Sequence, residues 1–520
     1  MNKQELTAQV IALIKSAQLN PADEPLLKAW LQPGTATTGI ASYDLEAPAK
    51  MLFPVLTPLR NRIPRVSGKG GIQANWRAIT GINVNQLSAG VGQGNRGGVV
   101  ASSTQDYTAA YRGIGLEDYV TFEADYASEY FQDLKATAVD NLLKGMMIGE
   151  EKFLLGGNTS LQLGQAIIAS AAASNTSGAL PDATYSVICV PLSAEATWTM
   201  GGFNNGFTGQ QMAPGIDLTK AQVPQLISRT NADGSVDTYG GGAGKKSAAS
   251  GGLVVNGGTG LGSVTASVTP IRGAFAYAWF LGTAGNEKLA AVTYINSVLI
   301  ANAAGAGNQT AASLVNTDYS TNSLAFDGLL TFASNPNLGA YYKAQATGVA
   351  GTGTPLTANG DGGVVEIDAA LQSFWDMYRL APDRIIVSSQ EQKNITKAVL
   401  KGTTTAAQRF VVNTTQGNVA GGFKVTSYLN QFTMGGAKEI PIELHPNMVP
   451  GTIFLECDEL PYPLSNVVNV MQVRTRRDYY QLEWPLRSRK YEYGVYADEV
   501  LQHYFPPSIG ILTNIADGLG

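Results

Sequence analysis

Residues 116–157 read LEDYVTFEADYASEYFQDLKATAVDNLLKGMMIGEEKFLLGG. No proline follows Tyr126 in this stretch, and apolar side chains recur at helical spacing at Phe131, Leu134, Ala138, Leu142 and Met146. The pattern predicts one amphipathic helix of roughly 30 residues that ends at the Gly156-Gly157 pair. Such a helix would be about 45 Å long, too long for one small core to cover. It therefore predicts contacts with distant parts of the chain or with other subunits.

Length and composition limit the class of protein. The chain has 520 residues, of which 44% are apolar and 14% charged, so it can bury cores for about two to four domains and is not disordered throughout. The net charge of -5 does not indicate a nucleic-acid binder. Cys189 and Cys457 lie far apart, and we expect two buried thiols.

The first 18 residues, MNKQELTAQVIALIKSAQ, interleave charges with apolar residues. They predict an amphipathic helix and not a secretory signal. Apolar runs of transmembrane length are absent from the sequence. We therefore expect a soluble protein that is made in a cytoplasm.

Charge is segregated along the first third of the chain. From Ala47 to Gln105 there is no acidic residue, and the basic residues there are Lys50, Arg60, Arg62, Arg65, Lys69, Arg77 and Arg96. The acidic residues that follow are Asp106, Glu117, Asp118, Glu123, Asp125, Glu129 and Asp133. This segregation suits head-to-tail contact between copies of the chain. A salt-bridged hairpin within one subunit explains it equally well.

The basic segment also carries a strand pattern. Closely spaced prolines at 48, 54, 58 and 64 predict an extended arm. Residues 72–80, which include Trp76, alternate as a strand, and residues 107–122 supply a return strand. The glycine-rich residues between them complete a long two-stranded arm with a mobile tip. Such a hairpin is only marginally stable until another surface covers it.

Four short strand-like runs between residues 176 and 302 are separated by glycine or proline turns: TYSVICVPLSAEA, LVVNGGTGLGSVTASVTP, GAFAYAWFLGT and LAAVTYINSVLIA. They predict a compact β-sandwich with Tyr277 and Trp279 in its core. Residues 240–252, GGGAGKKSAASGG, are expected to form a flexible loop.

From residue 314 onward, the sequence shows a mixed pattern of helices and strands. Residues 364–402 predict a helix, a turn, a buried strand at Arg384–Ser388 and a second helix, and strands are expected at 411–428 and 440–444. The remaining chain is strongly β and contains a basic cluster of Arg474, Arg476, Arg477, Arg487, Arg489 and Lys490. Strand alternation divides these arginines between two faces, so they do not form one nucleic-acid stripe. We favour subunit contacts to carboxylates such as those near Glu123, with weak non-specific DNA contact as the second choice.

Chemically active constellations are missing from the sequence. His445 and His503 are isolated and are expected to be ordinary polar or strand residues. The pairs Glu150-Glu151 and Asp458-Glu459 are interpreted as solvated charges. GGGAGKKS lacks the glycine that precedes the lysine in a phosphate loop. We predict no catalytic, metal or cofactor site, and an enzyme is the least supported class.

The order of parts, an arm, a basic hairpin, a long helix and a late β return, resembles the major capsid protein of tailed bacteriophages, the HK97-like fold. IGEEKFLLGGN (148–158) resembles the end of that family's spine helix, and PPSIGILTNI (506–515) is similar to its closing strand. GSVTASVTPIRGAFAYAWFLGTAGNEKLAAVT (262–293) resembles the immunoglobulin-like modules of some phage capsid proteins.

The resemblance implies an α+β fold with six parts. They are an N-terminal arm (1–65), an extended loop (66–112), a peripheral domain with the spine helix (113–175), an inserted immunoglobulin-like β-sandwich (176–302), an axial domain (303–440), and a return to the peripheral sheet with the C-terminal strand (441–520). Some family members crosslink a lysine of the extended loop to a neighbour's asparagine. Lys69 is the candidate donor by position, and the sequence identifies no partner for it.

The implied function is self-assembly into an icosahedral shell around a double-stranded DNA phage genome. Its partners would be copies of itself in hexamers and pentamers, portal, scaffold and decoration proteins, and packaged DNA by weak contact, with no membrane. The protein would be made in the bacterial host cytoplasm and reside in the virion. The alternative is an adhesin or tail protein whose sandwich binds carbohydrate. The candidate inter-subunit residues are Arg60, Arg62, Arg65, Lys69, Trp76, Arg77, Glu117, Asp118, Glu123, Asp125, Glu129, Arg474, Arg476 and Arg477.

Overall fold

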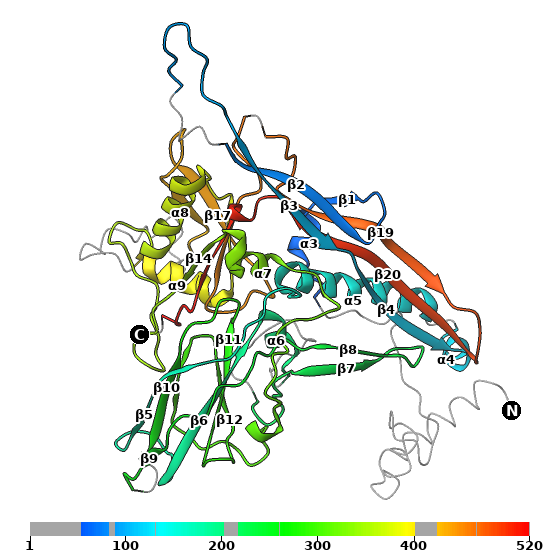
Figure 1. Cartoon of the computed structure of the whole chain (residues 1–520). Helices are drawn as coiled ribbons and strands as arrows, with labels where there is room; N and C mark the ends of the chain where they lie inside the picture. Colours follow the sequence, from blue (N-terminus) through cyan, green and yellow to red (C-terminus); the bar gives the residue numbers. More distant parts are fainter. Residues whose placement is uncertain are drawn as a thin grey trace, which may run out of the picture. The chain divides into compact units, whose positions relative to one another are not determined.

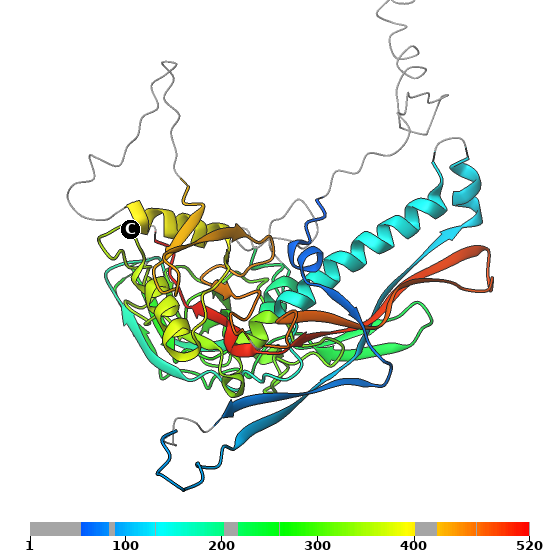
Figure 2. The same ribbon diagram turned by 90° about the horizontal axis from the view of Figure 1, so that it is seen from above.

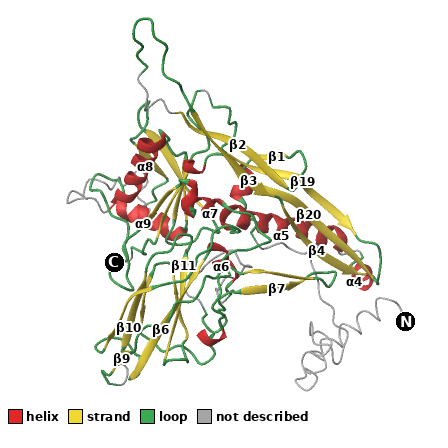
Figure 3. Cartoon of the chain, viewed as in Figure 1, coloured by secondary structure: helices red, strands yellow, loops and turns green. Residues whose placement is uncertain are grey.

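The computed structural model describes residues 54–82, 89–129, 132–201, 217–258, 261–400, 424–463 and 465–518. The predicted N-terminal helix and most of the strand expected at 411–428 lie outside these residues. The chain divides into two compact units, Met1–Leu52 with Val120–Thr137, and Phe53–Tyr119 with Ala138–Gly520. Figure 3 shows several sheets and few helices, which confirms the α+β class.

The predicted long helix is shorter than expected, and a separate short helix precedes it. Helix α4 (Phe122–Ala127) is short, and α5 (Leu134–Gly156) has 23 residues. Asp133 limits the second helix, because its Oδ1 accepts a hydrogen bond from the Ala136 N–H at 3.0 Å, as an N-cap residue does. The expected length of roughly 30 residues was therefore too great. The apolar stripe is confirmed, because Ala138, Leu142 and Met146 are buried.

The second unit contains a six-stranded mixed sheet. Its order is β14 (Tyr341–Ala344), β21 (Ile509–Thr513), β18 (Ile453–Glu456), β15 (Arg384–Val387), β17 (Lys438–Leu444) and β16 (Ser427–Asn430). Helices α8 (Val365–Tyr378) and α9 (Ser389–Leu400) share an apolar core with it (Figure 1). The predicted helix, strand and helix of residues 364–402 are confirmed. The closing strand β21 lies inside this sheet, between β14 and β18.

A four-stranded sheet lies beside the end of α5. Its order is β1 (Arg65–Ser67), β19 (Met471–Glu483), β20 (Lys490–His503) and β4 (Arg112–Thr121). Leu154 and Leu155 of the helix share one apolar core with Val473 and Val500 of the sheet. Strands β19 and β20, which come from the last part of the chain, belong to this sheet.

The predicted two-stranded arm is present as β2 (Gln73–Ile82) and β3 (Ser102–Ala110), which pair with each other (Figures 1 and 2). Among the described residues this hairpin pairs with no third strand. The expected return strand is divided at Tyr111, so that β3 pairs with β2 while β4 joins the four-stranded sheet. The hairpin therefore has an anchored base and a projecting end.

Two sheets form the predicted β-sandwich. One has the order β13 (Ser297–Ile300), β10 (Ser263–Val268) and β5 (Ile168–Ser174). The other has the order β12 (Lys288–Thr293), β11 (Ala276–Gly282), β6 (Ala183–Leu192) and β9 (Leu253–Val255). They share a core in which Trp279 is 0% and Tyr277 3% exposed, as predicted. Cys189 and Cys457 are free and buried, also as predicted. The immunoglobulin-like character of the sandwich stays a prediction.

Residues 240–252, expected to be a flexible loop, are packed against β6. The backbone N–H of Cys189 donates to Ser247 Oγ at 2.9 Å, and the Ser247 N–H donates to Cys189 O at 2.8 Å. Gly242 has a φ of 98°, and a Cβ atom there would lie 2.4 Å from Ser193 Oγ, so glycine is required. The prediction was wrong because these glycines allow close packing, not motion.

Short elements complete the unit. They are α3 (Pro58–Arg62), α6 (Ala194–Thr199), the hairpin of β7 (Leu226–Thr230) and β8 (Val236–Gly240), α7 (Leu329–Ser334) and three 3-10 turns at Ala311–Ser313, Pro336–Leu338 and Pro506–Ser508.

Burial along α5 gives a test of the fold. We expect Leu154→Ala to lower the free energy of unfolding by about 2–5 kcal/mol, because it leaves a cavity in the core. Leu154 is 0% exposed, whereas Leu143 on the same helix is 37% exposed. Leu143→Ala is therefore the matched control and should cost much less. Equal losses in urea unfolding would contradict the orientation of the helix.

Candidate subunit-contact site

Three arginines of the α3–β1 segment bind buried carboxylates, and we call this set of ion pairs the arginine clasp. Arg60 Nε lies 3.0 Å from Glu150 Oε2. Arg65 binds three acids: Glu150 Oε1, Glu499 Oε2 at 2.7 Å and Asp478 Oδ1 at 2.8 Å. The side chains of Glu150 and Glu499 are 0% exposed. The clasp thus joins the arm to α5, β19 and β20.

Tyr479 of β19 closes the clasp from one side. Its ring centroid lies 5.0 Å from the Arg60 guanidinium carbon and 5.1 Å from that of Arg65. Its hydroxyl donates to Glu150 Oε2 and accepts from Arg60 Nε. Each arginine therefore has an aromatic face as well as a carboxylate to bind.

Glu151 holds the start of the same segment. Its two carboxylate oxygens accept from the backbone N–H groups of Leu59, at 2.9 Å, and Arg60, at 2.7 Å. His445 Nε2 lies 2.7 Å from Glu151 Oε1. A neighbouring helix thereby supplies the acceptor that the free N–H groups of α3 require.

Arg62 connects the clasp to the six-stranded sheet. It binds Glu456 of β18 and lies 3.5 Å from Glu443 of β17. Arg384 of β15 continues the network through Glu443, at 2.8 Å, and Asp458. Carboxylates from two strands of this sheet, β17 and β18, therefore converge on one arginine of the arm.

Two sequence interpretations are corrected here. Glu150 and Glu151 are 1% and 0% exposed and are not solvated charges. His445 is 5% exposed and is not a surface residue, whereas His503 is 1% exposed and lies in β20, as the strand alternative predicted. Helical spacing could have indicated the burial of Glu150, because Glu150 lies four residues after Met146 and four before Leu154. Strand alternation could have indicated the burial of His503, since Glu499 and His503 fall on the buried face of β20.

Burial changes the ionisation of the clasp carboxylates. The pKa of Glu499 is raised to about 8 by desolvation and by the adjacent charge of Glu150, against the lowering effect of Arg65. The pKa of Glu456 is raised to about 8, again chiefly by desolvation. Oε1 of Glu499 has no hydrogen-bond partner among the described residues, which costs less for a neutral carboxyl than for a carboxylate.

The hairpin contains the exposed candidates. Arg77 and Asp106 face each other across its strands, with Arg77 Nη2 donating to Asp106 Oδ2 at 2.7 Å. Trp76 stacks on Tyr107 with ring centroids 5.7 Å apart. Lys69 is exposed near the base. Apolar side chains are also exposed along the hairpin and its loop, at 79% for Ile72, 70% for Ile79 and 84% for Val99.

The predicted arginines of β19 have partners within the chain. Arg476 Nη2 lies 2.9 Å from Asp498, and Arg477 lies over the Tyr480 ring with its guanidinium carbon 3.7 Å from the centroid. Arg474 Nη1 donates to Gln502 Oε1 at 3.4 Å. These arginines therefore have partners within the subunit, and their contacts with other copies stay a prediction.

The predicted acidic residues fall in both units. Glu117 accepts from the Tyr496 hydroxyl, and Asp118 Oδ1 accepts from the Tyr119 N–H at 2.8 Å. In the other unit, Asp125 lies 2.8 Å from Lys135 Nζ, and Glu123 and Glu129 are exposed. As inter-subunit contacts these residues also stay predictions.

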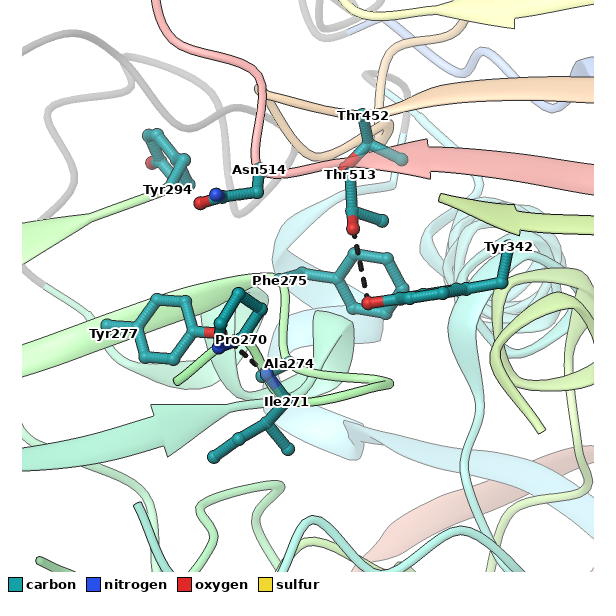
Figure 4. Close-up of a pocket in the computed structure, with 10 residues that line it drawn as sticks. All are labelled: Pro270, Ile271, Ala274, Phe275, Tyr277, Tyr294, Tyr342, Thr452, Thr513 and Asn514. Atoms are coloured by element: carbon teal, nitrogen blue, oxygen red, sulfur yellow. Dashed lines mark hydrogen bonds between the residues drawn. The ribbon is translucent and has the colours of Figure 1, made fainter. Parts of the chain in front are cut away.

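Other kinds of site were sought among the described residues. They contain no group of three or more His, Cys, Asp or Glu side chains placed to hold a metal ion, and no helix there is long and apolar enough to span a membrane. A cavity between the sandwich and the six-stranded sheet is lined by Tyr277, Tyr294, Tyr342 and Asn514 (Figure 4). Its volume is about 10 Å³, close to the smallest that holds one water molecule. It is too small for a ligand.

The chain aligns with several solved structures at low sequence identity. It aligns with the capsid of a native GTA particle at 10% identity and a TM-score of 0.39, over 92% of this chain and 96% of that one. It aligns with a chain of Microbacterium phage Oxtober96 at 8% identity and a TM-score of 0.39, over 95% of this chain and 99% of that one. It also aligns with the holo-SrpI encapsulin complex of Synechococcus elongatus PCC 7942 at 8% identity and a TM-score of 0.35, over 91% of this chain and 94% of that one. No protein-family model and no curated protein matches the chain in sequence.

Removal of an arginine from the clasp should lower the free energy of unfolding. We expect Arg65→Met to lower the free energy of unfolding at pH 7 by about 3 kcal/mol, because Glu150 and Glu499 then stay buried with one cation fewer. Arg77→Met is the control, since that arginine is 69% exposed in its pair with Asp106 and should contribute little. Urea unfolding of the two variants measures the difference. Similar losses would contradict the clasp.

The raised pKa of Glu499 predicts a pH dependence. Between the ordinary glutamate value of 4.5 and about 8, the folded state holds a proton that the unfolded state has released. Stability from this group is therefore complete below the unfolded pKa and is lost as pH rises toward 8. We expect Glu499→Gln to remove up to about 1.4 kcal/mol per pH unit from the slope of stability against pH in this window. Parallel slopes for variant and parent would show that Glu499 is ionised in the folded state.

Proposed function

We propose that this chain is the major subunit of an icosahedral phage shell, built on an HK97-like capsid fold. The observation that carries the proposal is the β2/β3 hairpin, which is anchored at its base and exposes apolar side chains such as Ile79 and Val99 along its length. A two-stranded ribbon of this kind is marginally stable alone. A neighbouring copy supplies the surface that it lacks.

The arginine clasp supports this function by holding the base of the hairpin. Arg65 begins β1, eight residues before β2, and it is bound to α5, β19 and β20 at once. The hairpin therefore leaves the body in a direction set by several ion pairs. Assembly from modest contacts needs such fixed directions, because closure of a lattice makes each further contact effectively intramolecular.

The contact candidates separate into two groups under this proposal. Arg60, Arg62 and Arg65 act inside the subunit, where their carboxylates already lie. The residues proposed to face other copies are Lys69, Trp76, Arg77, Glu117, Asp118, Glu123, Asp125, Glu129, Arg474, Arg476 and Arg477. The six parts and boundaries inferred from the resemblance belong to the proposal.

The partners follow from the same proposal. They are further copies of this chain in hexamers and pentamers, portal, scaffold and decoration proteins, and packaged double-stranded DNA by weak non-specific contact. The protein is made in the host cytoplasm and resides in the virion, and we assign it no enzymatic activity. A carbohydrate-binding adhesin is not favoured, because it gives no role to the hairpin and the clasp outside the sandwich.

Shortening of the hairpin tests the function. Residues 78–105 can be replaced by an Asn-Gly turn that joins Arg77 to Asp106, which are directly paired across the strands. The anchored base with Trp76 and Tyr107 is then kept. We expect the parent chain to form closed shells, visible by electron microscopy and sedimentation, and the shortened chain to form none.

The control for this experiment is the fold of the shortened chain, followed by its circular dichroism and urea unfolding. These should match the parent, because the removed residues contribute little to the core. Closed shells from the shortened chain would contradict the role of the hairpin. A parent chain that stays monomeric under every condition, with and without its native assembly factors, would contradict the function itself.

A further inference from the structure

A second cavity lies at the base of the β2/β3 hairpin and belongs to none of the contacts described above. Its volume is about 310 Å³, at the lower end of the range for small-ligand sites. Its lining comes from both strands of the hairpin, from Arg112 of β4, from the end of β20 and the turn that follows it, from the turn after α5, and from residues 326–338. The hairpin supplies one wall and the body of the unit supplies the others.

The walls of this cavity are largely aromatic. Trp76 and Tyr107, stacked on each other, line it from the hairpin. Phe326 and Phe332 line it from the body, together with Leu338. Such walls favour a flat or compact apolar group, because aromatic faces stack on rings at little entropic cost.

Two residues that line the cavity carry buried polar atoms without partners among the described residues. The indole N–H of Trp76 and both ring nitrogens of His503 have no hydrogen-bond partner among the described residues. His503 is 1% exposed, and burial lowers its pKa to about 3, so the neutral ring offers one N–H donor and one acceptor. Buried donors of this kind favour a ligand that carries an acceptor.

Arg112 adds a positive charge to the lining. Its Nε donates to the carbonyl of Ala325 at 3.2 Å, and no carboxylate among the described residues lies within ion-pair distance of it. The one acid in the lining is Asp327, whose Oδ1 already accepts from the N–H groups of Thr159 and Ser160 at 2.8 and 3.1 Å. Arg112 is therefore the group of the lining that can pair with an anionic ligand.

We propose that this cavity binds a compact aromatic group that carries a carboxylate, with the ring against Trp76 and Phe332 and the carboxylate at Arg112. Guanidinium and carboxylate form a strong, directional pair, and the Trp76 N–H supplies a further donor. The group can belong to a free organic acid or to the carboxyl end of a peptide. Because the walls come from both the hairpin and the body, the ligand ties one to the other. The inference does not depend on shell assembly.

Phenylacetate is the probe that tests this site on the full chain. Titration calorimetry should give saturable binding at one site per chain. Phenylacetamide, which lacks the charge, and acetate, which lacks the ring, should bind at least roughly tenfold more weakly, because each loses one of the two recognised features. Acetylglycylphenylalanine, with its carboxyl free or amidated, extends the comparison to a peptide. Binding of the free-acid peptide assigns a peptide end, and its failure to bind assigns a small acid.

Two arginine variants separate this site from general charge effects. Arg112→Gln should weaken phenylacetate roughly tenfold or more and leave phenylacetamide unchanged. Arg477→Gln makes the same change at an exposed arginine outside the cavity and should leave both unchanged. Trp76→Phe keeps a ring and removes the N–H, so a smaller, few-fold loss is expected.

Hydrogen exchange provides a readout that needs no variant. Saturating phenylacetate should slow amide exchange in residues 73–77 and 106–110, at the base of the hairpin, and leave the sandwich unchanged. The proposal is overturned by an absence of saturable binding, by equal binding of acid and amide, or by equal effects of Arg112→Gln and Arg477→Gln. Exchange that is unaffected by the probe would equally overturn it.

Discussion

The buried carboxylate of Glu150 is the constraint on which the rest of the second unit depends. A carboxylate without water must be paired or neutralised, and its cations, Arg60 and Arg65, both come from the arm before the hairpin. The arm can therefore occupy only the position that brings two guanidinium groups to one helix. Glu499 competes for Arg65 in the same place, and burial leaves one carboxyl of this pair holding a proton near neutral pH.

The ion pairs of the clasp contribute more to the position of the α3–β1 segment than to the free energy of folding. Desolvation of buried charges consumes most of their mutual attraction, so such pairs often contribute little net free energy compared with apolar residues of the same size. Their geometry is nevertheless strict, since Arg62 meets β17 and β18 while Arg65 meets α5, β19 and β20. One short segment thereby fixes the four-stranded sheet against the six-stranded one, and an apolar contact would allow more sliding.

This arrangement supports the proposal that the hairpin contacts a neighbouring copy. Its base is fixed by β1 and by the packing of Trp76 on Tyr107 and Tyr504, whereas its outer residues remain exposed. A projecting element with a fixed base presents the same apolar surface in every copy, which a repeating lattice requires. The aromatic cavity lies at this base, so occupation of the cavity and the direction of the hairpin are physically linked.

Local pattern was enough to predict the apolar stripe of α5, the β2/β3 pairing, the helix–strand–helix of residues 364–402 and the core position of Trp279, because 3.6- and 2-residue periods record which side of an element is buried. The same periods placed Glu150 and Glu499 on buried faces, but a charge on such a face is explained only when its partner is known. Arg65 and Glu499 are 434 residues apart, and His445 and Glu151 are 294 apart. The position of β21 between β14 and β18 likewise depends on pairing between distant strands. The sequence by itself therefore determined the elements and their buried sides, and the tertiary structure alone decided which charges meet, because ion pairing depends on distance in space and leaves no period in the chain.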